Sequence, residues 1–221
     1  MKNQNIQFNR TTPLIRMVGS LLCALLVSLA ALTARAQTAT VIDPQGDAYY
    51  SEGHEAPAFL DILAASFTIS NTLTLTVDVA GSLDALPNPA GSGGVFFWNF
   101  PLNTDNSTDP PGFPEAPGVT APADFAVYAQ WDGTAFRGVF VDRRPALTGG
   151  SALLYSIPVS VSGSRITLTV PAALAAQVRA AVVLPGATWN CDTGWSNTAL
   201  LGIGTNANHL ADVIGRHPWP Q

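Results

Sequence analysis

The stretch DILAASFTISNTLTLTVDV, residues 61–79, decides the fold. In its second half every other side chain is apolar, at positions Leu73, Leu75, Val77 and Val79. Strict alternation with a period of two is typical of a strand that buries one face. The polar pair before this run supplies a bend, so the stretch predicts two antiparallel strands joined as a hairpin.

An acidic turn precedes the hairpin, with the sequence Asp-Pro-Gln-Gly-Asp at residues 43–47. Pro44 fixes its own φ and Gly46 tolerates a positive φ, so the backbone is expected to reverse between two carboxylates. Asp61 opens the hairpin, and we expect Asp43, Asp47 and Asp61 to lie together at one end of a sheet. Ca²⁺ binds about six to eight oxygens and would suit these three carboxylates. Alternatively, the first two brace an Asx-type turn and the third is solvated.

The same residues carry a resemblance to a known family. The turn at 43–47, followed by Asp61-Ile62 and a long hairpin, resembles the DOMON-like sandwiches, which include family 9 carbohydrate-binding modules and the C-terminal module of glucodextranase-type enzymes. Residues 164–174 are similar to the late strand and proline-initiated helical turn of those modules, and Ala211-Asp212-Val213 is similar to their closing aspartate. The resemblance implies a jelly-roll-like β-sandwich, often with structural calcium and often attached to sugar-active proteins.

The middle of the chain adds a central strand and a second hairpin. Val95–Phe100 is apolar on both faces, which is typical of a central strand, and Trp98 is therefore expected in the core. Residues 124–131 and 134–141 flank an Asp132-Gly133 turn, a strong hairpin signal. Both features favour an all-β fold.

The remaining elements are predicted from short patterns. Residues 101–122 are rich in Pro, Asn, Asp and Thr and are expected to form one long surface loop. Strands are expected at 152–162, 164–170 and 178–184, with Pro171 opening a single helical turn at 172–177. Together these elements predict an antiparallel jelly-roll or immunoglobulin-like β-sandwich of about eight to ten strands with one short helical turn.

The N-terminus has the pattern of a secretory signal. Residues 1–16 carry basic side chains and no acid, residues 17–34 are almost wholly apolar, and Ala34-Arg35-Ala36 precedes Gln37. This pattern predicts a signal peptide at 1–36 that is cleaved after Ala36, and a secreted, extracellular or periplasmic location. The alternative is an uncleaved membrane anchor. Residues 37–221 are expected to form one domain with a mobile C-terminal tail at 216–221.

The charge balance excludes some partners. The chain has 10 Lys and Arg against 15 Asp and Glu, and removal of 1–36 leaves six arginines, no lysine and a net charge of −9. Nucleic acids and anionic membranes need a basic footprint and are excluded on this ground. Neutral sugars and divalent cations are compatible with it. Cys191 is the single cysteine after the signal, so it is either buried and inert or paired with another chain.

A second candidate site lies near the C-terminus, where residues 189–195 read WNCDTGW. Two tryptophans around a polar, glycine-containing loop would suit a sugar, because a flat ring covers a pyranose and nearby polar groups bind its hydroxyls. The predicted ligand-binding residues are Trp189, Asn190, Asp192 and Trp195. The alternative is that both rings pack on the core.

These observations predict a secreted, non-catalytic binding module with a structural calcium, and the resemblance implies carbohydrate as its ligand. No Ser-His-Asp or paired-glutamate signature stands out, and Glu52-Gly-His54-Glu55 is expected to be a solvated loop. One alternative is a structural or adhesive extracellular domain without a sugar site. The other is a small secreted hydrolase that uses acids near residues 101–122.

Overall fold

The computed structural model describes residues 36–50, 54–89, 94–107, 113–116, 119–121, 123–196 and 208–220. The chain divides into two compact units, Met1–Arg35 and Ala36–Gln221, and every described residue belongs to the second. Apart from Ala36, the predicted signal peptide lies outside the described residues. Among the residues that are described, no helix is both long enough and apolar enough to cross a membrane.

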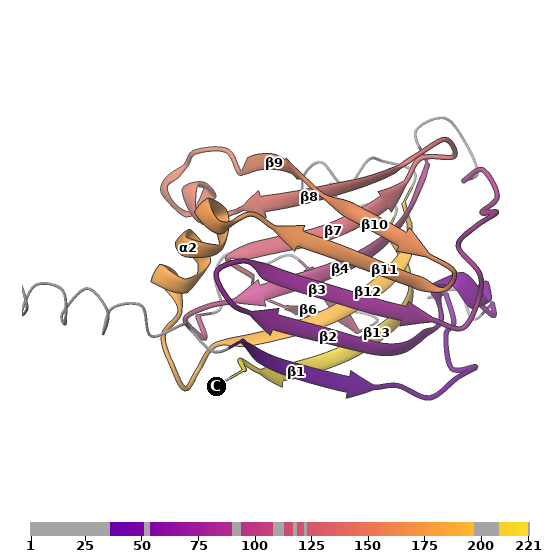
Figure 1. Cartoon of the computed structure of the whole chain (residues 1–221), viewed down its shortest axis with the longest axis horizontal. Coiled ribbons are helices and arrows are strands. Elements are labelled where there is room, and N and C mark those ends of the chain that lie inside the picture. Colours follow the sequence, from indigo (N-terminus) through magenta and orange to yellow (C-terminus); the bar gives the residue numbers. More distant parts are fainter. Residues whose placement is uncertain are drawn as a thin grey trace, which may run out of the picture. The chain divides into compact units, whose positions relative to one another are not determined.

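Two antiparallel sheets make up the second unit (Figure 1). In the described part of the chain, one sheet has five strands in the order β1 (Gln37–Ile42), β2 (Ile62–Ile69), β3 (Leu73–Val79), β11 (Arg165–Val170) and β10 (Val159–Ser162). The other has six, in the order β13 (Asn208–Pro218), β12 (Thr188–Ser196), β4 (Val95–Asn103), β7 (Phe125–Trp131), β8 (Phe136–Asp142) and β9 (Leu153–Ile157). The predicted antiparallel sandwich is confirmed, with more strands than expected.

The predicted hairpin of β2 and β3 is confirmed, and so is the alternation of its second strand. Phe67 pairs with Leu75, and the side chains at alternate positions of β3 from Leu73 to Val79 are buried. On its other side β3 pairs with β11, so the hairpin occupies the middle of the five-stranded sheet. The second predicted hairpin is also confirmed, because β7 and β8 pair around Gly133, which has a φ of 91°.

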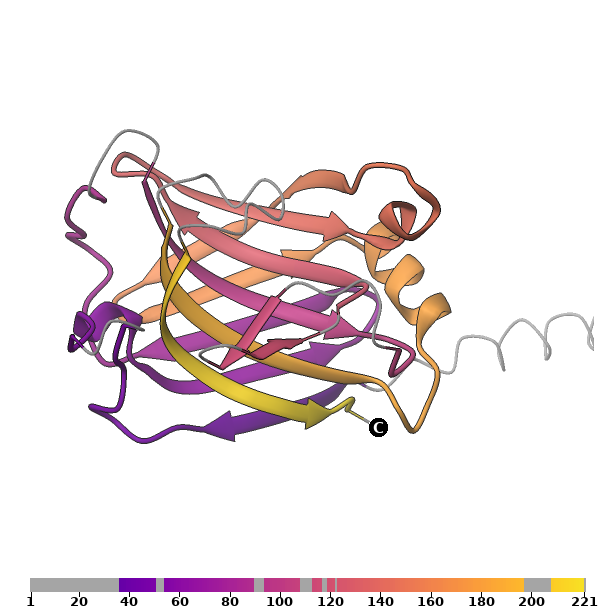
Figure 2. The same cartoon turned by 180° about the vertical axis from the view of Figure 1, so that it is seen from behind.

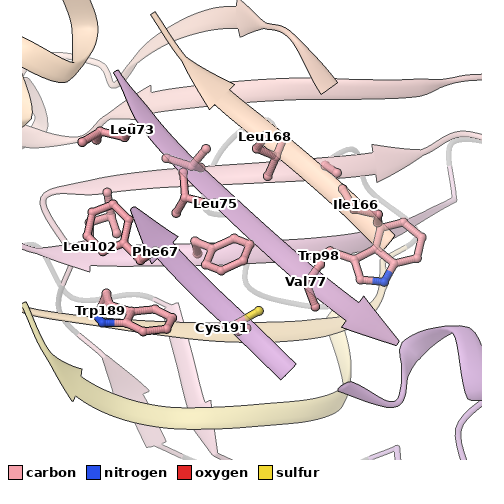
Figure 3. Packing of buried hydrophobic residues seen from close by; sticks show 14 of the residues in the cluster. Phe67, Leu73, Leu75, Val77, Trp98, Leu102, Ile166, Leu168, Trp189 and Cys191 are labelled. Atoms are coloured by element: carbon pink, nitrogen blue, oxygen red, sulfur yellow. The ribbon is translucent and has the colours of Figure 1, made fainter. Parts of the chain in front are cut away.

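The apolar core lies between the two sheets (Figure 3). All nine residues of β4 are buried, and the Trp98 side chain is 0% exposed, which confirms both its core position and the central place of this strand. The Trp98 indole Nε1 donates a hydrogen bond to the Phe59 carbonyl at 3.0 Å. The ring therefore buries its polar atom with a partner, as large aromatic side chains in cores generally do.

Two predictions about the second half of the chain are wrong in detail. The helix α2 spans Ala172–Ala181, so the strand expected at 178–184 does not form there; the alanine-rich run continues the helix that Pro171 opens. The single strand expected at 152–162 is divided at Pro158. Its first part, β9, pairs with β8, while its second part, β10, pairs with β11 in the other sheet.

The loop expected at 101–122 contains regular structure. β4 continues to Asn103, and β5 (Phe113–Ala116) and β6 (Val119–Ala121) form a separate two-stranded sheet. The mobile tail expected at 216–221 is also wrong for its described part. β13 continues to Pro218, and the buried Trp219 ring packs edge-on against Phe67 with the ring centroids 4.8 Å apart. Apolar burial therefore holds the end of the chain against the sandwich.

Candidate functional site

The acidic turn after β1 forms as its sequence predicts. The backbone amide of Asp43 donates to the Leu63 carbonyl at 3.0 Å, which fixes the start of the turn against β2. Gly46 has a φ of 87°, a conformation that glycine adopts without steric cost. The Gly46 amide donates to Oδ2 of Asp61 at 2.9 Å, so the third carboxylate of the predicted set braces the turn from the adjoining segment.

A fourth aspartate joins the first two. Asp212 of β13 places a carboxylate oxygen with one from Asp43 and one from Asp47, and these three atoms all lie within 4.8 Å of one another. Asp212 is held in place by backbone donors: Oδ2 accepts from the Ile62 amide at 2.6 Å and Oδ1 accepts from its neighbour Val213 at 2.8 Å. The turn lies at the end of the sandwich opposite α2 (Figure 1).

The structure brings together only two of the three predicted calcium ligands. Asp43 and Asp47 lie in the cluster, but its third member is Asp212 and not Asp61. Asp61 is 5% exposed, and its Oδ1 has no hydrogen-bond partner among the described residues. The position of Asp212 was signalled by the closing aspartate of the family resemblance. No rule of spacing could have supplied it, because its contact with Ile62 spans 150 residues.

The cluster is electrostatically unfavourable without a cation. Burial raises the pKa of Asp43 to about 6, and the charges of Asp47 and Asp61 add to the rise. Burial likewise raises the pKa of Asp212 to about 7, with contributions from the charges of Asp43 and Asp47, although its bonds from the Ile62 and Val213 amides oppose the rise. Convergent carboxylates with raised pKa values take up either protons or a cation.

The donor set suits a hard divalent cation. Oxygens bound at about 2.3–2.6 Å from a Ca²⁺ ion can lie up to about 5 Å apart, which matches the 4.8 Å limit of the cluster. All three donors are carboxylate oxygens, and the group contains no histidine or cysteine. This chemistry favours Ca²⁺, Mg²⁺ or Mn²⁺ over softer metals such as Zn²⁺.

The second predicted site has a different structure from the one expected. Residues 189–195 lie within the strand β12 and do not form a loop. Trp189 is 1% exposed, and its Nε1 donates to the Pro218 carbonyl at 3.2 Å. Trp195 is half-buried against the same core. The alternative reading, in which both rings pack on the core, is the one that matches their positions.

Asn190 and Asp192 alternate with these rings and face away from the core. Asp192 is opposite Asn99 of β4, and the Asn99 amide Nδ2 donates to its Oδ2 at 3.1 Å. Burial raises the pKa of Asp192 well above its ordinary value, although the hydrogen bond from Asn99 opposes the rise. The ligand-binding role predicted for these four residues stays a prediction.

Two other groups that the sequence analysis considered show no feature of a reactive site. His54 and Glu55 are exposed, as expected of a solvated loop, while Glu52 lies outside the described residues. Cys191 is a free, fully buried cysteine, and burial raises the pKa of its thiol well above its ordinary value. A buried neutral thiol is unreactive, which agrees with the inert role predicted for it.

The fold and the site together define a class: an antiparallel β-sandwich with a carboxylate cluster at one end. Comparison with known proteins found no family model, no curated protein and no solved structure that matches this chain. The likeness to DOMON-like modules accordingly rests on the residues quoted for it.

Proposed function

We propose that this chain is a secreted, non-catalytic β-sandwich module in which Asp43, Asp47 and Asp212 hold a structural Ca²⁺ ion. The observation that carries the proposal is that three carboxylate oxygens lie within 4.8 Å of one another. Two of them come from residues near the start of the domain's sequence and one from a residue near its end. Millimolar extracellular calcium would occupy about half or more of a site of this kind, since extracellular modules bind Ca²⁺ with dissociation constants of about 10⁻⁴–10⁻³ M.

The ion would connect the two sheets. β1, which leads into the acidic turn, is an edge strand of the five-stranded sheet, and β13, which carries Asp212, is an edge strand of the six-stranded sheet. β13 already contacts β2, and Asp212 already bonds the Ile62 amide. A cation shared by Asp43 and Asp212 would add a second link, one that replaces repulsion between carboxylates with attraction.

Secretion and carbohydrate binding belong to the same proposal. The A-x-A boundary before Gln37 supports export, and a net charge of −9 after removal of 1–36 suits neutral ligands and divalent cations. The likeness of residues 43–47 and 61–79 to carbohydrate-binding sandwiches supports a saccharide as the ligand.

Thermal unfolding with and without calcium tests the calcium site. The melting temperature of the purified protein is expected to rise with Ca²⁺ and to fall when a chelator is added. A ligand at a hundredfold excess over its Kd stabilises the folded state by about 2.7 kcal/mol. Asp212→Asn should lose this response. Asp84→Asn is the matched control, because Asp84 is exposed and bonds only its neighbour Ser82 among the partners described.

Two results would contradict the proposal. One is a melting curve of the wild-type protein that does not change on addition of chelator. The other is a calcium response of Asp212→Asn equal to that of Asp84→Asn.

A further inference from the structure

The six-stranded sheet carries a row of polar side chains on the face that points away from the five-stranded sheet. Across three neighbouring strands, Tyr128 of β7 is opposite Asn99 of β4, and Asn99 is opposite Asp192 of β12. Gln130 of β7 lies on the same face, opposite Phe97. Asn190 lies two positions before Asp192 on β12 and shares its face. We call these five polar residues, together with Phe97, the outer polar face.

The outer polar face is buried. The outward side of a sandwich sheet is usually solvated, yet Tyr128 is 0% exposed and Gln130, the most exposed of the six, is 8% exposed. The β5–β6 hairpin contacts β12 and β13 and lies across this side of the sheet (Figure 2). That hairpin is a sheet of its own, so no β-ladder joins it to the strands beneath.

Several polar atoms on this face have no partner. Among the described residues, no hydrogen bond reaches Oδ1 of Asn99, the hydroxyl of Tyr128, Oε1 of Gln130 or Nδ2 of Asn190. Buried polar atoms in folded proteins are almost always paired, and each unpaired atom destabilises the fold. Four such atoms on adjacent strands of one face indicate that something outside the described residues bonds to them.

The chemistry of the face indicates what that partner is. The unpaired atoms are amide and hydroxyl groups, which both donate and accept hydrogen bonds and carry no charge. Arg137 lies on this face opposite Gln130, and its guanidinium is already paired with Asp132 at 3.0 Å. The buried Arg143, which follows β8, donates from Nη1 to the Ala123 carbonyl at 3.0 Å. Phe97 adds a buried aromatic ring beside Gln130, and the facing position on β12 is Gly194, which has no side chain.

We propose that the outer polar face binds an uncharged, polyhydroxylated ligand of the saccharide class, with Asn99, Tyr128, Gln130 and Asn190 bonding its hydroxyls and Phe97 contacting its apolar side. Hydroxyl groups both donate and accept, as this mixture of atoms requires, and an aromatic ring covers the C–H face of a pyranose. The inference deepens the proposed binding role but uses none of the calcium-site residues. It places the sugar site on the opposite face of the six-stranded sheet from Trp189 and Trp195.

Ordered water is the competing occupant of these positions, since buried waters commonly bond otherwise unpaired polar atoms. The two occupants make different predictions for removal of a single polar atom. If a structural water completes the fold, removal of the atom should destabilise the ligand-free protein. If the atoms serve a ligand, removal should leave the ligand-free protein as stable or make it more stable, while binding weakens.

Isothermal titration calorimetry with cellopentaose, xylopentaose and maltopentaose tests the proposal on the intact protein. The variants are Tyr128→Phe, which removes only the hydroxyl, and Gln130→Leu, which removes the amide at similar size. Tyr155→Phe is the matched control, because Tyr155 packs on the core side against Phe140 at 6.1 Å between ring centroids. At least one of the three oligosaccharides should bind wild type and Tyr155→Phe equally and bind each face variant about tenfold or more weakly. The melting temperature of the ligand-free face variants should be unchanged or higher.

The proposal fails if none of the oligosaccharides binds, if the face variants bind as wild type does, or if both face variants melt below the control. Lower melting of both variants would assign the face to structural water. The calcium proposal fails separately, since it is read from the effect of chelator on melting and not from sugar binding.

Discussion

The interior between the sheets and the outer polar face are both buried, yet they treat polar atoms in opposite ways. In the interior, the indole nitrogens of Trp98 and Trp189 donate to the carbonyls of Phe59 and Pro218, and the Thr193 hydroxyl donates to the carbonyl of Leu60. On the outer polar face, the hydroxyl of Tyr128 and one amide atom each of Asn99, Gln130 and Asn190 have no partner in the described part of the chain.

The difference separates the parts of the molecule whose structure is explained by folding alone from the parts that need another explanation. The same strands, β4 and β12, build both faces, so backbone geometry is not the cause. Apolar burial with these three polar atoms paired stabilises the sandwich and needs no further explanation. Unpaired buried atoms, like the crowded carboxylates of the acidic turn, destabilise it. Such local departures from stability are typical of places where a protein binds something.

The largest expected effect is on the interior side. Trp98→Ala and Trp189→Ala should each lower the free energy of unfolding by about 3–5 kcal/mol, because each removes a large buried ring and the hydrogen bond of its nitrogen. Denaturant unfolding measures this change. For Trp189 a loss below about 1 kcal/mol, together with weakened sugar binding, would restore the ligand role first predicted for that ring and break the contrast between the two faces.

The next effect distinguishes Asp61, which bonds the acidic turn, from the proposed calcium ligands. Asp61→Asn keeps an oxygen for the Gly46 amide and should retain the calcium stabilisation, about 2.7 kcal/mol at a hundredfold excess over Kd. Asp47→Asn removes a charge from the cluster and should lose most of it. Calcium titration followed by thermal melting of both variants measures the difference. Loss of the response in Asp61→Asn would return Asp61 to the ligand set.

A smaller effect should appear with pH in the presence of chelator. The folded-state pKa values of Asp43 and Asp212 are raised to about 6 and about 7, so between about pH 4 and 7 the folded state binds more protons than the unfolded state. Stability from these groups is complete below about pH 4 and is lost as the pH rises to 7, by about 1 kcal/mol once solvent screening is allowed for.

The measurement is the free energy of unfolding in chelator at several pH values. Asp212→Asn should flatten this part of the curve, and saturating calcium should remove the loss. A wild-type protein that gains stability from pH 4 to 7 by the same amount as Asp212→Asn would show that the carboxylates do not repel one another.

The smallest effect concerns Asp132, a half-buried and well-paired carboxylate at the surface. Oδ1 of Asp132 accepts from the Thr134 and Ala135 amides, both at 2.9 Å, at the turn between β7 and β8. Asp132→Ala should cost about 1 kcal/mol or less, because water replaces bonds lost at the surface. Chemical denaturation of this variant alongside Trp98→Ala measures the ratio. A cost as large as that of Trp98→Ala would mean that pairing, and not burial, dominates stability here.

Much of the fold could be predicted because its signals are local. The alternation at 73–79, the doubly apolar run at 95–100 and the Asp132-Gly133 turn each specify a strand or hairpin within a few residues. The acidic turn was predicted for the same reason, since Pro44 and Gly46 act on their own backbone. Two of the three clustered aspartates follow directly from that turn.

The errors share a different cause, which is that distant contacts override local composition. The sequence predicts a loop at 189–195 because Asn190 and Asp192 are polar, whereas in the structure both are buried on a strand that lies between two others. The sequence predicts a mobile tail because nothing near Trp219 in the chain shows that its ring packs against Phe67. Asp212 is a candidate metal ligand because β13 lies beside β2, a contact between strands that are far apart in the sequence.

The division of one strand at Pro158 has a consequence for the rate of folding. β9 completes one sheet and β10 the other, so neither sheet can reach its full width before the chain has crossed between them. The pairing of β3 with β11 brings together residues 87 positions apart, at Asp78 and Arg165. Folding is slow because the entropy cost of closing such long loops comes before the contacts that stabilise them. All-β sandwiches of this kind fold in about milliseconds to seconds. Both sheets should therefore appear in a single kinetic phase, since the crossing strand makes each depend on the other.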